Sequence, residues 1–149
     1  ALPVGQLAAK DCVLWLWATH PMLPHAIEVL AAWGFTFKTS GVWVKRTPTG
    51  KLGFGTGYVL RSASEPFLIG TFGRPILAKN IRTVVEGQLR EHSRKPEEAY
   101  AAAERMVPGA LHRLDLFSRQ DRPGWQAWGD EAGKFPVVEP SGNPPVRPV

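Results

Sequence analysis

Cysteine is nearly absent from this sequence. Cys12 is the single cysteine in 149 residues, so neither a disulfide framework nor a cysteine-rich metal site is available. It lies inside an apolar stretch, where a free cysteine is most often buried as a small hydrophobic residue. This usage suits a reducing cytoplasm, which is where we expect the protein.

Long apolar runs and several familiar motifs are missing as well. No run approaches the roughly 18 apolar residues of a membrane-spanning helix, and no signal peptide is evident, so we expect no membrane partner. No metal-ligand spacing connects Cys12 with His25, His92 or His112, and we expect no metal site. The sequence has no Gly-x-Ser-x-Gly elbow and no Gly-x-x-x-x-Gly-Lys-Ser/Thr loop, which removes the commonest hydrolase and nucleotidase interpretations.

The patterns that are present predict an α/β domain. With 44% hydrophobic and 21% charged residues, the chain has the composition of one globular domain. Residues 11–18 form an apolar run typical of a strand buried on both faces of a parallel sheet, and we expect it to be central. Residues 22–33 show helical spacing, and residues 35–45 form the next strand, so we expect a right-handed parallel crossover.

The second half of the chain continues this alternation. Pro96 and the acidic turn after it favour a helix start, with Pro96 as the first helical residue, and Pro108 ends this helix. Residues 112–117 alternate as a strand and lead into a charged turn at 118–122. In open α/β sheets such loops beyond the carboxyl ends of strands hold the ligand. We therefore expect a ligand site here.

Glycine and proline mark the loops and the domain boundary. Residues 47–57 form a glycine-rich loop that can move or let a phosphate approach the backbone. As a phosphate-binding motif the loop is weak, because no suitable strand-to-helix frame surrounds it. Further strands are expected at 65–71 and 84–85.

His20 follows the first strand, and is either a substrate contact or a surface histidine. The domain is expected to cover residues 1–135, with a proline-rich, disordered or extended tail at 136–149.

The net charge of +5 is concentrated in the middle of the chain. From Lys38 to Lys95 there are eleven Lys and Arg residues and three acidic ones. A basic segment interleaved with aromatic residues suits a surface that follows phosphates and stacks bases. A solvated positive face over core aromatics gives the same pattern. The candidates for nucleic-acid contacts are Lys45, Arg46, Lys51, Arg74, Lys79 and Arg82.

Several short motifs follow one another in a specific order over residues 11–131. They are the apolar run Asp11 to Thr19, Trp43-Val44-Lys45, Glu65 to Gly70, the Lys95-Pro96 turn, Asp115-x-Phe117, and Trp128-Gly129 followed by an acidic residue. The ordered set resembles the MT-A70 family of N6-adenine methyltransferases. Bacterial and phage members of that family act on DNA, and eukaryotic members act on mRNA.

The resemblance implies a fold, a cofactor and a set of site residues. The fold would be a Rossmann-like methyltransferase sheet with helices on both faces, and the cofactor S-adenosyl-L-methionine. Lys95 would pair with the methionyl carboxylate, and Asp115 and Arg119 would line the edge that receives the ribose. Asp130 and Glu131 would form the turn near adenine and ribose, although the family commonly has amides or Asn-Glu there, so Asp130 departs from its pattern.

Simpler interpretations of these residues stay open. Lys95 is also explained as a surface residue at a helix start, and Asp115 as the partner of Arg113 or Arg119 in an ordinary ion pair. Asp121 and Arg122 occupy variable positions and receive no role.

The family's catalytic Asp-Pro-Pro-Trp motif does not occur in this sequence, so the catalytic residues are unknown. We expect a methyltransferase fold that is N-terminally incomplete because the sequence begins downstream of the motif. The predicted function is methyl transfer to adenine N6 in nucleic acid, with DNA favoured over RNA. The alternative is a catalytically silent relative that binds nucleic acid or an active partner subunit. Both the active methyltransferase and the catalytically silent relative are compatible with a homodimer or a heterodimer.

Overall fold

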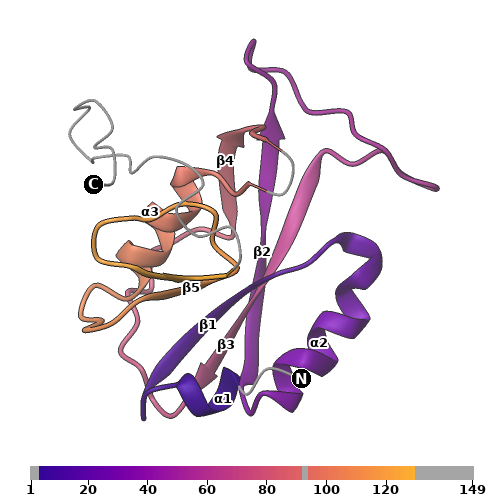
Figure 1. Cartoon of the computed structure of the whole chain (residues 1–149). Coiled ribbons are helices and arrows are strands. Elements are labelled where there is room, and N and C mark those ends of the chain that lie inside the picture. The colour runs from indigo at the N-terminus through magenta and orange to yellow at the C-terminus, as the bar shows by residue number, and fades with distance from the viewer. Residues whose placement is uncertain (1–3, 92–93, 130–149) are drawn as a thin grey trace. The chain divides into compact units, whose positions relative to one another are not determined.

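A mixed four-stranded sheet organises the first part of the chain (Figure 1). The computed structural model describes residues 4–91 and 94–129, and the chain divides into two compact units, Ala1–Pro108 and Gly109–Val149. The sheet belongs to the first unit and has the strand order β1-β3-β2-β4. Its strands are β1 (Cys12–Trp17), β2 (Thr36–Arg46), β3 (Ser64–Phe72) and β4 (Val84–Gln88).

The expected central position of the first strand was wrong. In the sheet that the described residues form, β1 lies at an edge, and all six of its residues are only partly buried. The reason is that β3 folds back between β1 and β2 and pairs antiparallel with both. The strands β1 and β2 therefore run in the same direction, as expected, but they are not neighbours, and the sheet is mixed rather than parallel.

Two helices cover opposite faces of this sheet (Figure 1). The helix α2 (Leu23–Ala32) follows a single 3-10 turn at His20–Met22 and buries Ala26 and Leu30. Gly70 on β3 makes this close packing feasible, because an added Cβ atom would lie 3.0 Å from a methyl group of Leu30. A short helix, α1 (Val4–Leu7), precedes the sheet.

The helix α3 (Glu97–Met106) packs over the other face. Pro96 is its N-cap residue, in an extended conformation, so the prediction that Pro96 is the first helical residue was off by one position. The acidic first turn complements the helix dipole, as the sequence indicated. The core beneath the helix is a cluster of buried residues from two strands and α3, namely Phe67, Ile69, Val85, Ala99 and Ala102.

The connection between β2 and β3, residues 47–63, contains the predicted glycine-rich loop and extends beyond the sheet (Figure 1). It carries exposed apolar side chains, since Phe54, Tyr58, Val59 and Leu60 are all at least 82% exposed. Apolar groups of this size in such exposed positions are not explained by packing within the first unit.

The second unit contains two short parallel strands, β5 (Leu114–Leu116) and β6 (Gln126–Trp128), with Asp115 opposite Ala127. The predicted strand at 112–117 is thus shorter, because Phe117 leaves the extended region with a φ angle of 61°. The boundary predicted after Phe135 and the proline-rich tail lie outside the described residues. No helix in the described part of the chain has the length and apolarity that crossing a membrane requires.

Cys12 is partly rather than fully buried. Burial raises the pKa of its thiol above the ordinary value, because the charged thiolate loses solvation inside the protein. Cys12 therefore stays a neutral thiol at physiological pH, in keeping with the packing role predicted for it.

Candidate functional site

Three charged side chains from separate parts of the first unit meet on one face of the sheet. Glu65 is the second residue of β3, Lys45 lies near the end of β2, and Lys95 directly precedes the N-cap residue of α3. The Lys95 Nζ atom forms a short ion pair with Glu65 Oε1. The Lys45 Nζ atom lies 3.5 Å from Glu65 Oε2. We refer to these three residues as the lysine–glutamate cluster.

The cluster is largely withdrawn from solvent. The side chains of Glu65, Lys95 and Lys45 are 13%, 18% and 20% exposed. Charged groups at this depth attract each other more strongly than they do at an open surface, because the effective dielectric is lower. Two ammonium groups and one carboxylate leave the cluster with a formal charge of +1, so it can accept an anionic group.

Two tryptophans form the aromatic floor of the cluster. Lys95 Nζ lies 5.0 Å from the ring centroid of Trp17, and Lys45 Nζ lies 5.1 Å from that of Trp43. The two indole rings meet edge to face, with 6.2 Å between their centroids. Each lysine is therefore held by a carboxylate and by the face of an aromatic ring, and cation–π contacts of this kind contribute about 0.5–2 kcal/mol each.

The backbone around Lys95 is fixed by several contacts. Pro96 is fully buried, and the Arg90 guanidinium donates to the carbonyl of Lys95 at 3.0 Å and to Glu97 Oε1 at 3.0 Å. The side-chain hydrogen bond from Arg94 holds the pKa of Glu91 below its usual value. The start of α3, and with it the ammonium group of Lys95, is thereby held against the sheet.

Gly87 lets this segment approach β4. A Cβ atom added at Gly87 would lie 2.7 Å from the Cβ atom of Pro96 and 2.9 Å from Glu98 Oε2. The carbonyl of Gly87 accepts a hydrogen bond of 3.0 Å from the indole N–H of Trp43. A residue without a side chain at this position therefore allows both the aromatic floor and the start of α3 to pack closely.

The second unit holds the other predicted donor-site residues that the structure describes. Asp115 lies on β5, and its Oδ2 atom is 3.6 Å from Nη1 of Arg122, whose side chain is 7% exposed. Arg122, which received no role from the sequence, therefore faces a predicted ribose contact. Arg119 lies in the same turn, where Ser118 donates to the carbonyl of Gln120 at 2.7 Å.

Three of the five predicted donor-site residues can thus be located, in two different units. Lys95 belongs to the first unit, whereas Asp115 and Arg119 belong to the second. The corner predicted from these three residues stays a prediction. Asp130 and Glu131 lie outside the described residues.

The predicted nucleic-acid residues are dispersed over the first unit. Lys45 belongs to the lysine–glutamate cluster, and Arg46 forms an ion pair of 2.8 Å with Glu86. Lys51 lies on the β2–β3 connection. The remaining exposed residues of this set are Arg74, whose backbone N–H donates to Asp11 Oδ1 at 2.8 Å, and Lys79 and Arg82.

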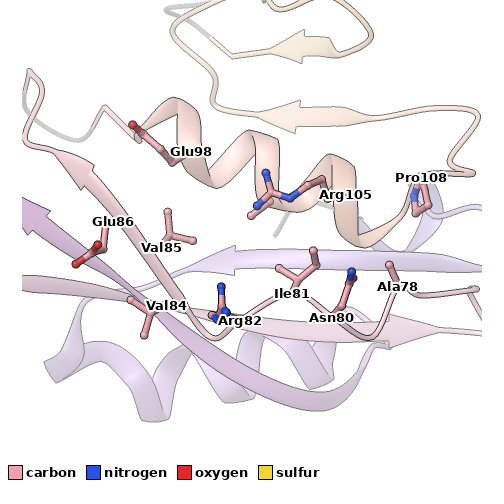
Figure 2. A pocket seen from close by; sticks show the side chains of 11 residues that line it. Ala78, Asn80, Ile81, Arg82, Val84, Val85, Glu86, Glu98, Arg105 and Pro108 are labelled. Atoms are coloured by element: carbon pink, nitrogen blue, oxygen red, sulfur yellow. The ribbon is translucent and has the colours of Figure 1, made fainter.

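A cavity of about 580 Å³ lies between α3 and the segment that leads into β4. Figure 2 shows Arg82 and Arg105 approaching it from these two elements, with Glu86 and Glu98 toward one end. Arg82 is a predicted nucleic-acid residue, whereas the predicted donor-site residues in the described part of the chain do not line the cavity. Because its lining carries both signs of charge, it is not a simple anion site.

His20 lies in the 3-10 turn that follows β1. Its Nε2 atom is 2.9 Å from the hydroxyl of Ser64, the residue before Glu65, and both side chains are accessible to solvent. This contact is compatible with both interpretations of His20, as a substrate contact and as a surface histidine.

Comparison with known proteins supports the family resemblance that was based on the order of the motifs. A family model described as MT-A70 matches residues 1–131. The chain belongs to the MT-A70 family. It is 32% identical over 134 residues to the Type II methyltransferase M.MunI of a Mycoplasma species, covering 87% of this chain and 54% of that protein.

Two eukaryotic relatives show the same pattern. The chain is 35% identical over 130 residues to an Arabidopsis thaliana N(6)-adenosine-methyltransferase MT-A70-like protein, which covers 81% of this chain and 18% of that protein. It is 29% identical over 149 residues to the Homo sapiens N(6)-adenosine-methyltransferase catalytic subunit METTL3, which covers 93% and 24% respectively. This MT-A70 chain thus spans about half of the bacterial relative and a quarter or less of these two.

The sequence prediction missed Glu65, Trp17 and Trp43 as site residues. Glu65 contributed to the resemblance but received no role. A signal for it did exist, because it is one of three acidic residues among eleven basic ones in the segment 38–95. An isolated acid in such a segment is a natural partner for nearby lysines, but the pattern does not reveal which ones.

Proposed function

We propose that this MT-A70 chain is part of an S-adenosyl-L-methionine-dependent methyltransferase that modifies adenine N6 in nucleic acid, with DNA preferred over RNA. The family membership supports the reaction class. The observation that carries the proposal is the lysine–glutamate cluster, in which Lys95 offers a held ammonium group beside an aromatic floor. The preference for DNA is the expectation from the resemblance to bacterial and phage members of the family.

The residues present fit this cofactor. The formal charge of +1 on the cluster suits one carboxylate group, and Lys95 is accessible enough, at 18% exposed, for a ligand to reach it. Asp115 and Arg119 of the second unit would contact the ribose, and Asp130 and Glu131 the ribose and adenine. When bound, the sulfonium group supplies an activated methyl group.

In the proposed mechanism the described residues bind and orient. Lys95 fixes one end of the donor through a point charge whose position is set by Glu65 and Trp17. Trp17 and Trp43 exclude water from one side of the cluster, which strengthens its electrostatic interactions. Adenine N6 is a poor nucleophile because its lone pair is delocalised into the ring, so much of the rate enhancement comes from holding the reactants in line.

Further parts of the proposal concern fold, nucleic acid and compartment. The parallel direction of β1 and β2 and the helices on both faces support a Rossmann-like sheet. The basic character of the segment 38–95 supports phosphate contacts from Lys45, Arg46, Lys51, Arg74, Lys79 and Arg82. The single cysteine of the sequence supports a reducing cytoplasm as the compartment.

A methyl-transfer assay tests the proposed reaction. The full-length protein is incubated with labelled S-adenosylmethionine and with adenine-containing DNA and RNA of matching sequence. We expect label on adenine N6, with more in DNA, and none in a control oligonucleotide in which N6-methyladenine replaces adenine. A protein that binds S-adenosylhomocysteine and DNA but transfers no methyl group would instead support the catalytically silent binding subunit.

We also propose that the β2–β3 connection contacts a second copy of the chain. Four large side chains of this connection are each at least 82% exposed, and exposed apolar groups of this size are common at protein interfaces. Replacing Tyr58 and Leu60 together with serine is expected to reduce the mass measured by light scattering from a dimer to a monomer. Equal masses for the variant and the wild type would argue against this interface.

A further inference from the structure

We propose that Glu65 is a positioning residue shared by both substrates: it holds Lys95 for the methyl donor and Lys45 for the nucleic acid. This inference rests on the proposed function, in which Lys95 serves the donor and Lys45 the acceptor. It assigns a role to an acidic residue within a basic surface, where an acid would otherwise oppose the binding of phosphate.

The strand register places these groups on one face. Glu65 is directly opposite Trp43 in the β2–β3 ladder, and Trp17 is directly opposite Phe67 in the β1–β3 ladder. Residues directly opposite each other, and residues two apart on a strand, point to the same face of a sheet. Lys45, Glu65 and both tryptophans therefore share the face over which α3 packs.

The two oxygens of Glu65 are divided between the two lysines. Oε1 binds Lys95 and Oε2 lies 3.5 Å from Lys45. Two ammonium groups that share one carboxylate are close enough to repel each other, and the negative charge between them offsets this repulsion. Removing that charge would drive the two lysines apart.

Positioning matters because lysine is flexible. A free lysine side chain loses much rotamer freedom when it is immobilised by a ligand, and a side chain that is already held loses less. Each lysine of the cluster is held on two sides, by Glu65 and by an indole ring. Without the carboxylate, only the ring contact is left to orient it.

Replacing Glu65 with glutamine tests the inference. Glutamine keeps the size of the side chain, removes the charge, and replaces one of the two acceptor oxygens with an NH2 donor. In the full-length protein, E65Q is expected to weaken binding of S-adenosylhomocysteine and of adenine-containing DNA by about tenfold each, because a lysine that Glu65 no longer holds loses more rotamer freedom when it binds a ligand. The KM values for both substrates should rise, while kcat at saturation stays within about threefold of the wild type.

Double-mutant cycles separate positioning from a general structural effect. The effects of E65Q and Lys95→Met on donor binding should be less than additive, because both remove the same oriented ammonium group. The same holds for E65Q and Lys45→Met in DNA binding. Glu86→Gln is the matched control, since Glu86 pairs with Arg46 outside the cluster, and it should leave donor affinity unchanged. Glu65→Asp keeps the charge and should restore much of the binding that E65Q loses, which also provides a folded variant if E65Q is unstable.

Several results would contradict the inference that Glu65 positions the two lysines. If the wild type binds both ligands and E65Q binds them equally well or more tightly, Glu65 does not position the lysines and the inference fails alone. Fully additive cycles, or an Asp variant as weak as E65Q, also overturn it. If the wild type itself does not bind S-adenosylhomocysteine, the proposed function fails and the inference fails with it.

Discussion

Replacing Lys95 with methionine is expected to weaken binding of S-adenosylhomocysteine by about 10- to 100-fold. A hydrogen bond to a charged group contributes about 1.5–3 kcal/mol, and 1.4 kcal/mol corresponds to a factor of ten in affinity. Methionine keeps an unbranched apolar stem against Trp17, so the change removes mainly the charge. Titration calorimetry on the full-length protein measures the effect directly.

Lys38→Met is the matched control for this experiment. Lys38 lies on β2 and is exposed, and it does not belong to the lysine–glutamate cluster. The control variant should bind S-adenosylhomocysteine as the wild type does, and thermal unfolding should show that both variants are folded. An unchanged affinity in Lys95→Met would remove Lys95 from the donor site.

Much of the fold was predictable from local patterns. The helices α2 and α3 were expected within one or two residues of their observed ends, because apolar spacing and the proline and glycine positions mark these ends. The strand β3 was expected at 65–71 and is observed at Ser64–Phe72. These signals are carried by the segment itself, so they do not depend on what packs beside it.

The position of a strand within the sheet, unlike the ends of a helix or strand, cannot be predicted from the segment's own residues. The apolar run of β1 was interpreted as a central strand, but the neighbours of a strand are decided by distant segments. Here β3 returns between β1 and β2. Apolar side chains on β1 pack against residues of β3, as Trp15 does by stacking on Phe67 at 3.9 Å between centroids. A strand with one neighbour in the described sheet can therefore be as apolar as a strand with two.

The candidate site was predictable only in part for the same reason. Lys95 was proposed through the family resemblance, in which the Lys-Pro turn at a helix start is one of the matched motifs. Glu65 and the two tryptophans become site residues only through the registers of β3 with β2 and with β1. These registers depend on how the β2–β3 connection and the segment containing α2 fold, which no spacing rule in the sequence specifies.

Replacing Gly87 with alanine is expected to lower both the stability of the protein and its affinity for the donor. The new Cβ atom would lie 2.7 Å from the Cβ atom of Pro96, which belongs to a rigid ring, and near the carboxylate of Glu98. Overpacking of a closely packed site costs about 1–3 kcal/mol, and we expect the free energy of unfolding, measured by urea titration, to fall by about this amount.

The loss of affinity follows from the position of Lys95 next to Pro96. If the start of α3 moves away from β4, the ammonium group of Lys95 moves with it, and its contacts with Glu65 and Trp17 lengthen. Gly109→Ala is the matched control, because an added Cβ atom there has no neighbour within 4 Å, and its stability should stay within about 0.5 kcal/mol of the wild type. A Gly87→Ala protein that is destabilised but binds S-adenosylhomocysteine normally would show that donor binding does not depend on how closely α3 approaches the sheet.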